Sequence, residues 1–128
     1  MACILIVEDS PTQQESIKRA IEKMGHKAIC VNDGSEAFDA ALQHQPDLIL
    51  MDVIMPHTNG FQATRILTKD ERTKHIPVVM VTNKGEKSDQ AWGKRQGASA
   101  YVIKPFDAKA LGELVENILQ NHSVVDKT

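Results

Sequence analysis

The sequence predicts a single α/β domain in which five parallel strands alternate with five helices to form a doubly wound sheet. Two features of the 128-residue chain lead to this prediction. Short apolar runs alternate with segments that carry apolar residues at helical spacing. The runs also lack strict apolar–polar alternation, which is typical of strands that helices cover on both faces of a parallel sheet.

Five apolar runs mark the expected strands, which are 3–7 (CILIV), 27–31 (KAICV), 48–51 (LILM), 78–81 (VVMV) and 101–103 (YVI). The first two runs contain the two cysteines of the chain, Cys3 and Cys30. We expect both to be buried free thiols rather than a disulfide, because the composition is that of an intracellular protein.

The first helix has clear start and stop signals. Ser10 and Pro11 are typical of an N-cap and of a first helical position, and Gln13 offers the reciprocal bond of a capping box. An apolar stripe follows at helical spacing, and Gly25 is placed to end the helix. The other helices are expected to begin near Asp33 (with Glu36 in a second capping box), Asn59, Glu86 and Asp107.

The fourth helix, expected over residues 86–96, is the weakest of the five. It is polar, it contains Gly93, and its apolar face has little beyond Ala91 and Trp92. A helix with so few buried anchors shifts more easily than its neighbours. Trp92 is either a helix-packing aromatic or a partner contact, and the sequence leaves both interpretations open.

Composition argues against several function classes. The formal net charge of −2 gives no broad attraction to nucleic acid or to anionic membranes. No apolar run approaches the roughly 20 residues of a membrane span, and the N-terminus lacks the residue order of a signal peptide, so we expect a cytoplasmic protein. The five histidines (26, 44, 57, 75 and 122) lack metal-ligand spacing and are expected on the surface.

Polar side chains follow four of the five predicted strands. Glu8 and Asp9 come after the first, Asp52 after the third, Thr82 after the fourth and Lys104 after the fifth. The carboxyl ends of parallel strands meet at one edge of the sheet, so these side chains are expected to converge there. Each one alone is more often a helix cap, a turn former or a solvated charge. Their coincidence predicts a functional site.

Three carboxylates at one edge repel one another and raise one another's pKa unless a cation lies among them. Hard oxygen ligands of this kind suit Mg²⁺, and they also accept Mn²⁺. Lys104 adds a positive charge suited to phosphate, and Thr82 adds a hydroxyl. Burial of Asp52 in its apolar segment, LILMDVIM (48–55), is costly unless the carboxylate is paired or bound. We interpret Asp52 as a nucleophile that forms an aspartyl phosphate.

Four motifs, LIVEDS (5–10), LILMDVIMPHTNG (48–60), VMVTNKG (79–85) and GASAYVIKPF (97–106), resemble those of a known family. Over essentially its full length the chain resembles the CheY-like response-regulator receiver domains. This resemblance implies the flavodoxin-like strand order 2-1-3-4-5 and a phosphoryl group that passes from a histidine kinase to Asp52. It also implies that Glu8, Asp9, Asp52 and the backbone carbonyl of Ile54 hold Mg²⁺.

The resemblance further implies a conformational switch. Lys104 contacts a phosphoryl oxygen, Pro105 follows a cis peptide bond, Thr82 moves toward the phosphoryl group and Tyr101 turns inward. These changes reshape the face of the fourth helix, fifth strand and fifth helix, where a downstream protein binds. The chain would then be no enzyme beyond gaining and losing its own phosphoryl group.

A narrower resemblance links GFQATRILTKD (60–70) and AWGKRQGA (91–98) to stand-alone receivers of type IV pilus chemosensory systems, which govern twitching motility. The polar residues that end the sequence lead us to expect a receiver domain over 1–122 and a polar tail over 123–128, with no room for an output domain, and we expect a monomer. Such a domain either signals to a partner protein or acts as a phosphate sink, and the sequence does not separate the two.

Two departures from the family pattern concern the site. Glu8 stands where many members carry Asp, so its longer side chain reaches a metal differently or through water. Ile54 is apolar where some relatives carry a polar side chain, and Lys84 stands two residues after Thr82. Because both positions flank the route of the attacking water, we expect slow-to-moderate self-dephosphorylation.

Three alternative functions fit less well. A Mg²⁺-dependent phosphatase with an aspartate nucleophile carries a second carboxylate two residues later, where this chain has Ile54. A flavin- or nucleotide-binding domain carries a phosphate loop after the first strand, where Glu8 and Asp9 would repel phosphate. A phosphorylation-independent binding module would have lost Asp52, Thr82 or Lys104, and all three are present.

Overall fold

The computed structural model describes residues 1–55 and 59–127, with side chains described as far as residue 121. Of the five histidines expected on the surface, His57 therefore lies outside the described residues, and so does the side chain of His122. Five strands and five helices alternate along the chain: β1 Cys3–Val7, α1 Pro11–Lys23, β2 Lys27–Val31, α2 Gly34–His44, β3 Leu48–Met51, α3 Gly60–Lys69, β4 Val78–Thr82, α4 Lys87–Arg95, β5 Ala100–Ile103 and α5 Ala108–Lys127. All five predicted strands are present, to within one residue at each end.

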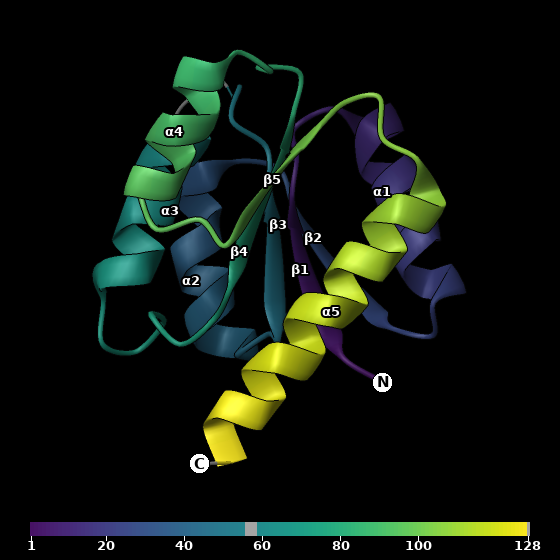
Figure 1. Cartoon of the computed structure of the whole chain (residues 1–128), viewed down its shortest axis with the longest axis vertical. Helices are drawn as coiled ribbons and strands as arrows, with labels where there is room; N and C mark the ends of the chain where they lie inside the picture. The colour runs from purple at the N-terminus through teal and green to yellow at the C-terminus, as the bar shows by residue number, and fades with distance from the viewer. Residues whose placement is uncertain (56–58, 128) are drawn as a thin grey trace.

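The strands form one parallel sheet in the order β2-β1-β3-β4-β5, which confirms the predicted fold class and strand order. In Figure 1, α1 and α5 cover one face of this sheet, and α2, α3 and α4 cover the other. The three central strands β1, β3 and β4 are almost entirely buried, as expected for strands between two helical layers.

Alternate residues of the central strands enter two separate hydrophobic cores. Ile4 and Ile6 of β1 pack with Ile17 and Ile21 of α1 and with apolar residues of α5. Leu5 and Val7 point to the opposite face and pack with apolar residues of α2 and α3. Because side chains of a strand alternate between faces, one continuous apolar run supplies both cores.

The predicted helix start positions agree with the structure, but the predicted capping-box hydrogen bonds agree less well. The Ser10 Oγ accepts a hydrogen bond from the Gln13 backbone N–H, and Asn59 caps α3 through the Gln62 N–H. The prediction that the Gln13 side chain accepts from the Ser10 N–H is wrong, because this N–H donates to Glu8 Oε2 instead. In the second box the Glu36 carboxylate accepts from Asn32, one residue before the cap.

The α4 helix is weakly anchored, as expected from its sequence. Gly93 is its buried residue, and its N-cap Glu86 makes no side-chain capping bond within the described part of the chain. A Cβ on Gly93 would lie 2.9 Å from the Tyr101 ring, so glycine allows the tyrosine to pack beneath the helix. Trp92 is 48% exposed, which leaves much of its ring available to solvent.

Three other expectations need correction or refinement. Cys3 and Cys30 are free thiols, as predicted, but both are half-buried rather than buried, and burial raises the pKa of each. His26 is not a surface residue: its side chain is 9% exposed, accepts from the Ala2 N–H and contacts Glu116. The α5 helix continues to Lys127, through most of the segment predicted as a polar tail.

Within residues 1–55 and 59–127, no helix combines the length and apolar character needed to cross a membrane.

Gly60, the first residue of α3, lies directly against the backbone of Asp52. A Cβ at this position would lie 2.0 Å from the Asp52 carbonyl oxygen, and backbone atoms would have to move to accept it. We expect Gly60→Ala to lower the free energy of unfolding by about 2–4 kcal/mol, as overpacking does at rigid sites. Urea denaturation measures this change.

Gly112→Ala in α5 is the matched control for that substitution. Its Cβ would lie 3.3 Å from the sulfur of Met24, which belongs to a flexible side chain that can yield. Alanine also favours a helix interior over glycine by up to about 1 kcal/mol. The control should therefore be neutral or stabilising, and equal losses for the two variants would contradict the assigned role of Gly60.

Candidate functional site

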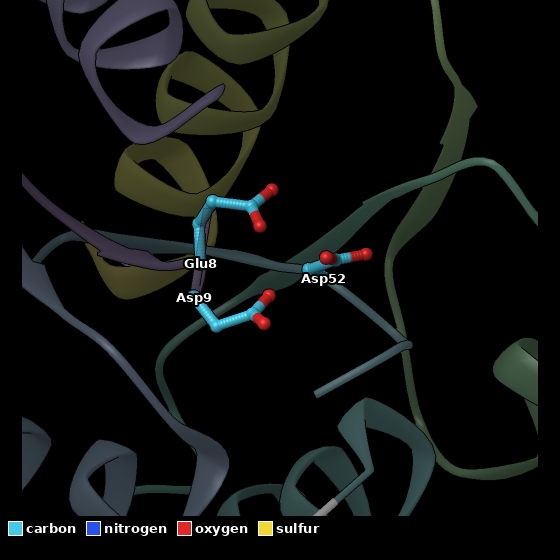
Figure 2. Close-up of side chains that lie close together, drawn as sticks. All are labelled: Glu8, Asp9 and Asp52. Atoms are coloured by element: carbon cyan, nitrogen blue, oxygen red, sulfur yellow. The ribbon is translucent and has the colours of Figure 1, made fainter. Parts of the chain in front are cut away.

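The register of the sheet places the three predicted acids together. Val7 of β1 pairs with Met51 of β3, so the next residues, Glu8 and Asp52, leave neighbouring strands side by side. The Asp52 N–H continues the ladder by donating to the Val7 carbonyl at 3.0 Å. One carboxylate oxygen from each of Glu8, Asp9 and Asp52 lies within 4.8 Å of the others. Figure 2 shows the first two extending from the end of β1 toward Asp52.

Burial differs among these three acids. Glu8 is 1% exposed and Asp52 is 7% exposed, whereas Asp9 faces solvent. The Asp52 Oδ1 accepts a hydrogen bond of 2.7 Å from the Val53 N–H. The Glu8 Oε2 accepts from the Ser10 N–H at 3.2 Å, which fixes one side of its carboxylate. The cluster is therefore an ordered pocket with one acid open to solvent.

Lys104 brings a positive charge to this pocket from the end of β5. Its backbone N–H donates to the Thr82 carbonyl at 2.8 Å, and the following bond to Pro105 is cis, as the resemblance implies. The side chain is 8% exposed. Its Nζ lies 2.5 Å from Glu8 Oε1 and 3.7 Å from Asp52 Oδ2, and it also donates to Gln13 Oε1.

The electrostatics of the pocket favour a bound cation. Burial raises the pKa of Glu8 above its usual range, and the nearby Asp52 adds to this, while hydrogen bonds from Lys104 and from Ser10 oppose it. When ionised, three carboxylates and one ammonium leave a net charge of −2. A divalent metal ion that prefers oxygen ligands matches both this charge and this donor set.

Thr82 and Tyr101 lie next to the pocket rather than among the acids. Thr82 is fully buried at the end of β4, and its Oγ1 accepts from the Lys84 N–H at 3.4 Å. The Tyr101 hydroxyl donates to the Lys84 carbonyl at 2.6 Å. Burial, helped by Asp89 and Asp52, raises the pKa of Tyr101 to about 12. Both predicted switch residues therefore hold the backbone of Lys84.

Ile54 lies at the solvent side of the site. Its side chain is 58% exposed. It lines a cavity of about 320 Å³ together with Val53, Met55, Asn59, Phe61 and Lys84. The two positions predicted to flank the route of an attacking water, Ile54 and Lys84, thus border the same cavity.

Sequence reasoning missed two contributors to the site. Gln13 was assigned to a capping box, but its side-chain oxygen accepts from Lys104. The backbone N–H of Ser10 holds Glu8. A signal for Gln13 was available, because the first turn of a helix that follows Glu8 and Asp9 must lie beside the carboxyl edge of the sheet.

Comparison with known proteins agrees with this geometry. The model of the response regulator receiver domain matches residues 4–116 of the chain. Protein PilH from Pseudomonas aeruginosa is 47% identical over 119 residues, which cover 93% of this chain and 98% of that protein.

Solved structures show the same likeness. The chemotaxis protein CheY4 from Vibrio cholerae is 27% identical with a TM-score of 0.85, and the match covers 91% of this chain and 98% of that one. The receiver domain of a sensor histidine kinase from P. aeruginosa, described with a magnesium ion coordinated in its active site cleft, is 31% identical with a TM-score of 0.81, covering 94% and 95%. With a matching family model over most of the chain and a fold shared with these structures, this protein belongs to the response regulator receiver domain family.

Proposed function

We propose that this protein is a single-domain response regulator in which Asp52 accepts a phosphoryl group from a histidine kinase. The observation that carries the proposal is the buried Asp52 carboxylate, which shares its pocket with two further acids and with the Lys104 ammonium. Asp52 Oδ1 is engaged by the Val53 N–H, whereas Oδ2 has the Lys104 ammonium 3.7 Å away. We assign Oδ2 as the nucleophile.

The proposed transfer exchanges one bond to phosphorus for another. The Asp52 oxygen attacks the phosphorus of a phosphohistidine, a P–O bond forms, and the P–N bond breaks with its electron pair going to the imidazole nitrogen. In a separate hydrolysis reaction, water attacks the phosphorus, the P–O bond to Asp52 breaks, and inorganic phosphate, a proton and the free carboxylate result. Lys104 stabilises the negative charge that develops on the phosphoryl oxygens.

Glu8, Asp9 and Asp52, together with the backbone carbonyl of Ile54, would hold a Mg²⁺ ion, or Mn²⁺ in its place. The donor set of hard carboxylate oxygens within 4.8 Å of one another supports this assignment. When bound, the ion neutralises charge on the acids and on the phosphoryl oxygens. The magnesium ion described in the receiver of the P. aeruginosa sensor kinase is further support.

The backbone of Lys84 is the proposed link from the site to an output surface. Thr82 accepts from its N–H and Tyr101 donates to its carbonyl, so a movement of Thr82 toward a phosphorylated Asp52 acts on the segment that leads into α4. Trp92 of α4 and Ile103 of β5 are 48% and 41% exposed, and α4, β5 and α5 form the face that we propose for output. A downstream protein target would bind this face.

The biological setting we propose is control of type IV pilus twitching motility. The identity of 47% with PilH supports it, as does the resemblance of residues 60–70 and 91–98 to stand-alone receivers of pilus systems. In this setting a chemosensory histidine kinase supplies the phosphoryl group to a cytoplasmic monomer. The alternative role is that of a phosphate sink, which would use the same chemistry at Asp52 without a downstream target.

Intact-mass spectrometry after incubation with acetyl phosphate tests the phosphoacceptor. We expect a roughly +80 Da adduct on the wild type in the presence of Mg²⁺, little adduct in EDTA, and none on Asp52→Asn, which lacks the nucleophile. Asp107→Asn is the control, because asparagine also caps a helix and this position lies outside the pocket. An equal adduct on Asp52→Asn would show that another residue is modified.

Thermal unfolding tests the metal site. At a Mg²⁺ concentration about ten times its Kd, binding to the folded state alone adds about 1.4 kcal/mol. For a domain of this size we expect a rise in Tm of about 4–8 °C. Asp9→Asn should lose most of this rise, because it removes one ligand, whereas Asp39→Asn on the exposed surface of α2 should keep it. The same rise in all three proteins would place the ion elsewhere.

The lifetime of the adduct tests the role of Ile54. The exposed isoleucine offers no hydrogen bond to an attacking water, so we expect the adduct to persist for minutes or longer after acetyl phosphate is removed. Ile54→Asn should shorten this lifetime about fivefold by orienting water. Ile66 is also exposed but lies on α3, so Ile66→Asn is the matched control and should leave the lifetime of the adduct unchanged. A wild-type lifetime of seconds would refute the expectation.

A further inference from the structure

The Lys104 ammonium contacts one uncharged side chain, that of Gln13, in addition to the acids of the pocket. Its Nζ donates to Gln13 Oε1 and to Glu8 Oε1, while Asp52 Oδ2 is 3.7 Å away. An ammonium group has three N–H donors. Gln13 and Glu8 occupy two of them, and the third remains for the space beside Asp52.

Gln13 reaches this position because the start of α1 leaves its side chain free. The Gln13 backbone N–H is held by Ser10 Oγ, which fixes the first turn of the helix beside the carboxyl edge of the sheet. The Ser10 N–H, which a capping box would assign to Gln13, is taken by Glu8 Oε2. One Glu8 carboxylate thus holds the helix start through Oε2 and Lys104 through Oε1.

The uncharged character of Gln13 matters for its effect on Lys104. An additional carboxylate at this place would attract the ammonium at least as strongly as Asp52 does and would draw it away from a phosphoryl group. An amide oxygen instead directs one N–H while adding no net charge. Because the Lys104 side chain is 8% exposed, water has limited access to replace this acceptor if it is lost.

We propose that Gln13 is a positioning residue for Lys104, which holds the ammonium so that its third N–H faces the phosphoryl group on Asp52. The expected effect on phosphorylation rests on the proposed function. The geometric part, a Gln13 acceptor that restrains Lys104, stands on the contacts of the unphosphorylated protein alone.

Gln13→Met is the decisive variant, since methionine keeps the length and flexibility of the side chain but removes the strong acceptor. We expect phosphorylation by acetyl phosphate at saturating Mg²⁺ to slow about tenfold, the size of effect that a hydrogen bond to a charged group commonly supports. The second readout is the ¹⁵N signal of the Lys104 side-chain ammonium in NMR. It should be visible in the wild type and broadened by faster hydrogen exchange in Gln13→Met.

Two variants serve as controls. Gln62 is the third residue of α3, as Gln13 is of α1, and its backbone N–H is likewise held by the N-cap side chain, but its own side chain is exposed. Gln62→Met should change neither the rate nor the Lys104 signal. Gln13→Glu retains an acceptor oxygen at the same place, so it should keep the Lys104 signal that Gln13→Met loses.

The two readouts separate this inference from the proposed function. A slower rate with a lost Lys104 signal in Gln13→Met, but not in Gln62→Met, supports the positioning role. An unchanged signal and rate in Gln13→Met would overturn it, and so would loss of the signal in Gln13→Glu. If the wild type forms no adduct, the proposed function fails, and the NMR comparison still decides whether Gln13 restrains Lys104.

Discussion

Lys104 reaches from the end of β5 into a pocket where Glu8 and Asp52 are almost fully removed from solvent. Buried carboxylates without a cation are costly, and the Lys104 ammonium offsets part of that cost. The contacts are unequal, because Lys104 lies against Glu8 and stands off from Asp52. Asp52 therefore keeps one oxygen, Oδ2, with no close partner among the described contacts, while the pocket as a whole retains the charge that a divalent ion would complement.

The sheet provides the rigidity that this arrangement needs. Glu8 and Asp52 follow paired residues of two central strands, and the backbone of Asp52 is held by Val7 on one side and confined by Gly60 on the other. Backbone atoms at the ends of buried strands move little, so the Glu8 and Asp52 carboxylates keep their separation.

The other side of the pocket is less firmly anchored. The segment from Thr82 to α4 is held through the Lys84 peptide, and α4 itself has one buried residue and a weak N-terminal cap. Elements with few buried contacts sit at the low-stability end of a domain and move at small cost. A rigidly held Asp52 beside a weakly anchored helix is the arrangement that the proposed switch would require.

The strands, their burial on both faces and the convergence of Glu8, Asp9, Asp52 and Lys104 were all predictable from the sequence, because apolar periodicity and position after a strand are local properties. The partners of Gln13 and His26 were not predictable. Gln13 had a plausible local role in a capping box, but its side chain contacts Lys104 instead. His26 was expected on the surface, but its side chain contacts Glu116. Both partners are distant in the sequence. Sequence alone determined where the chemistry lies, whereas tertiary structure decided which of several competing partners each polar group contacts, because that choice depends on neighbours that only folding brings together.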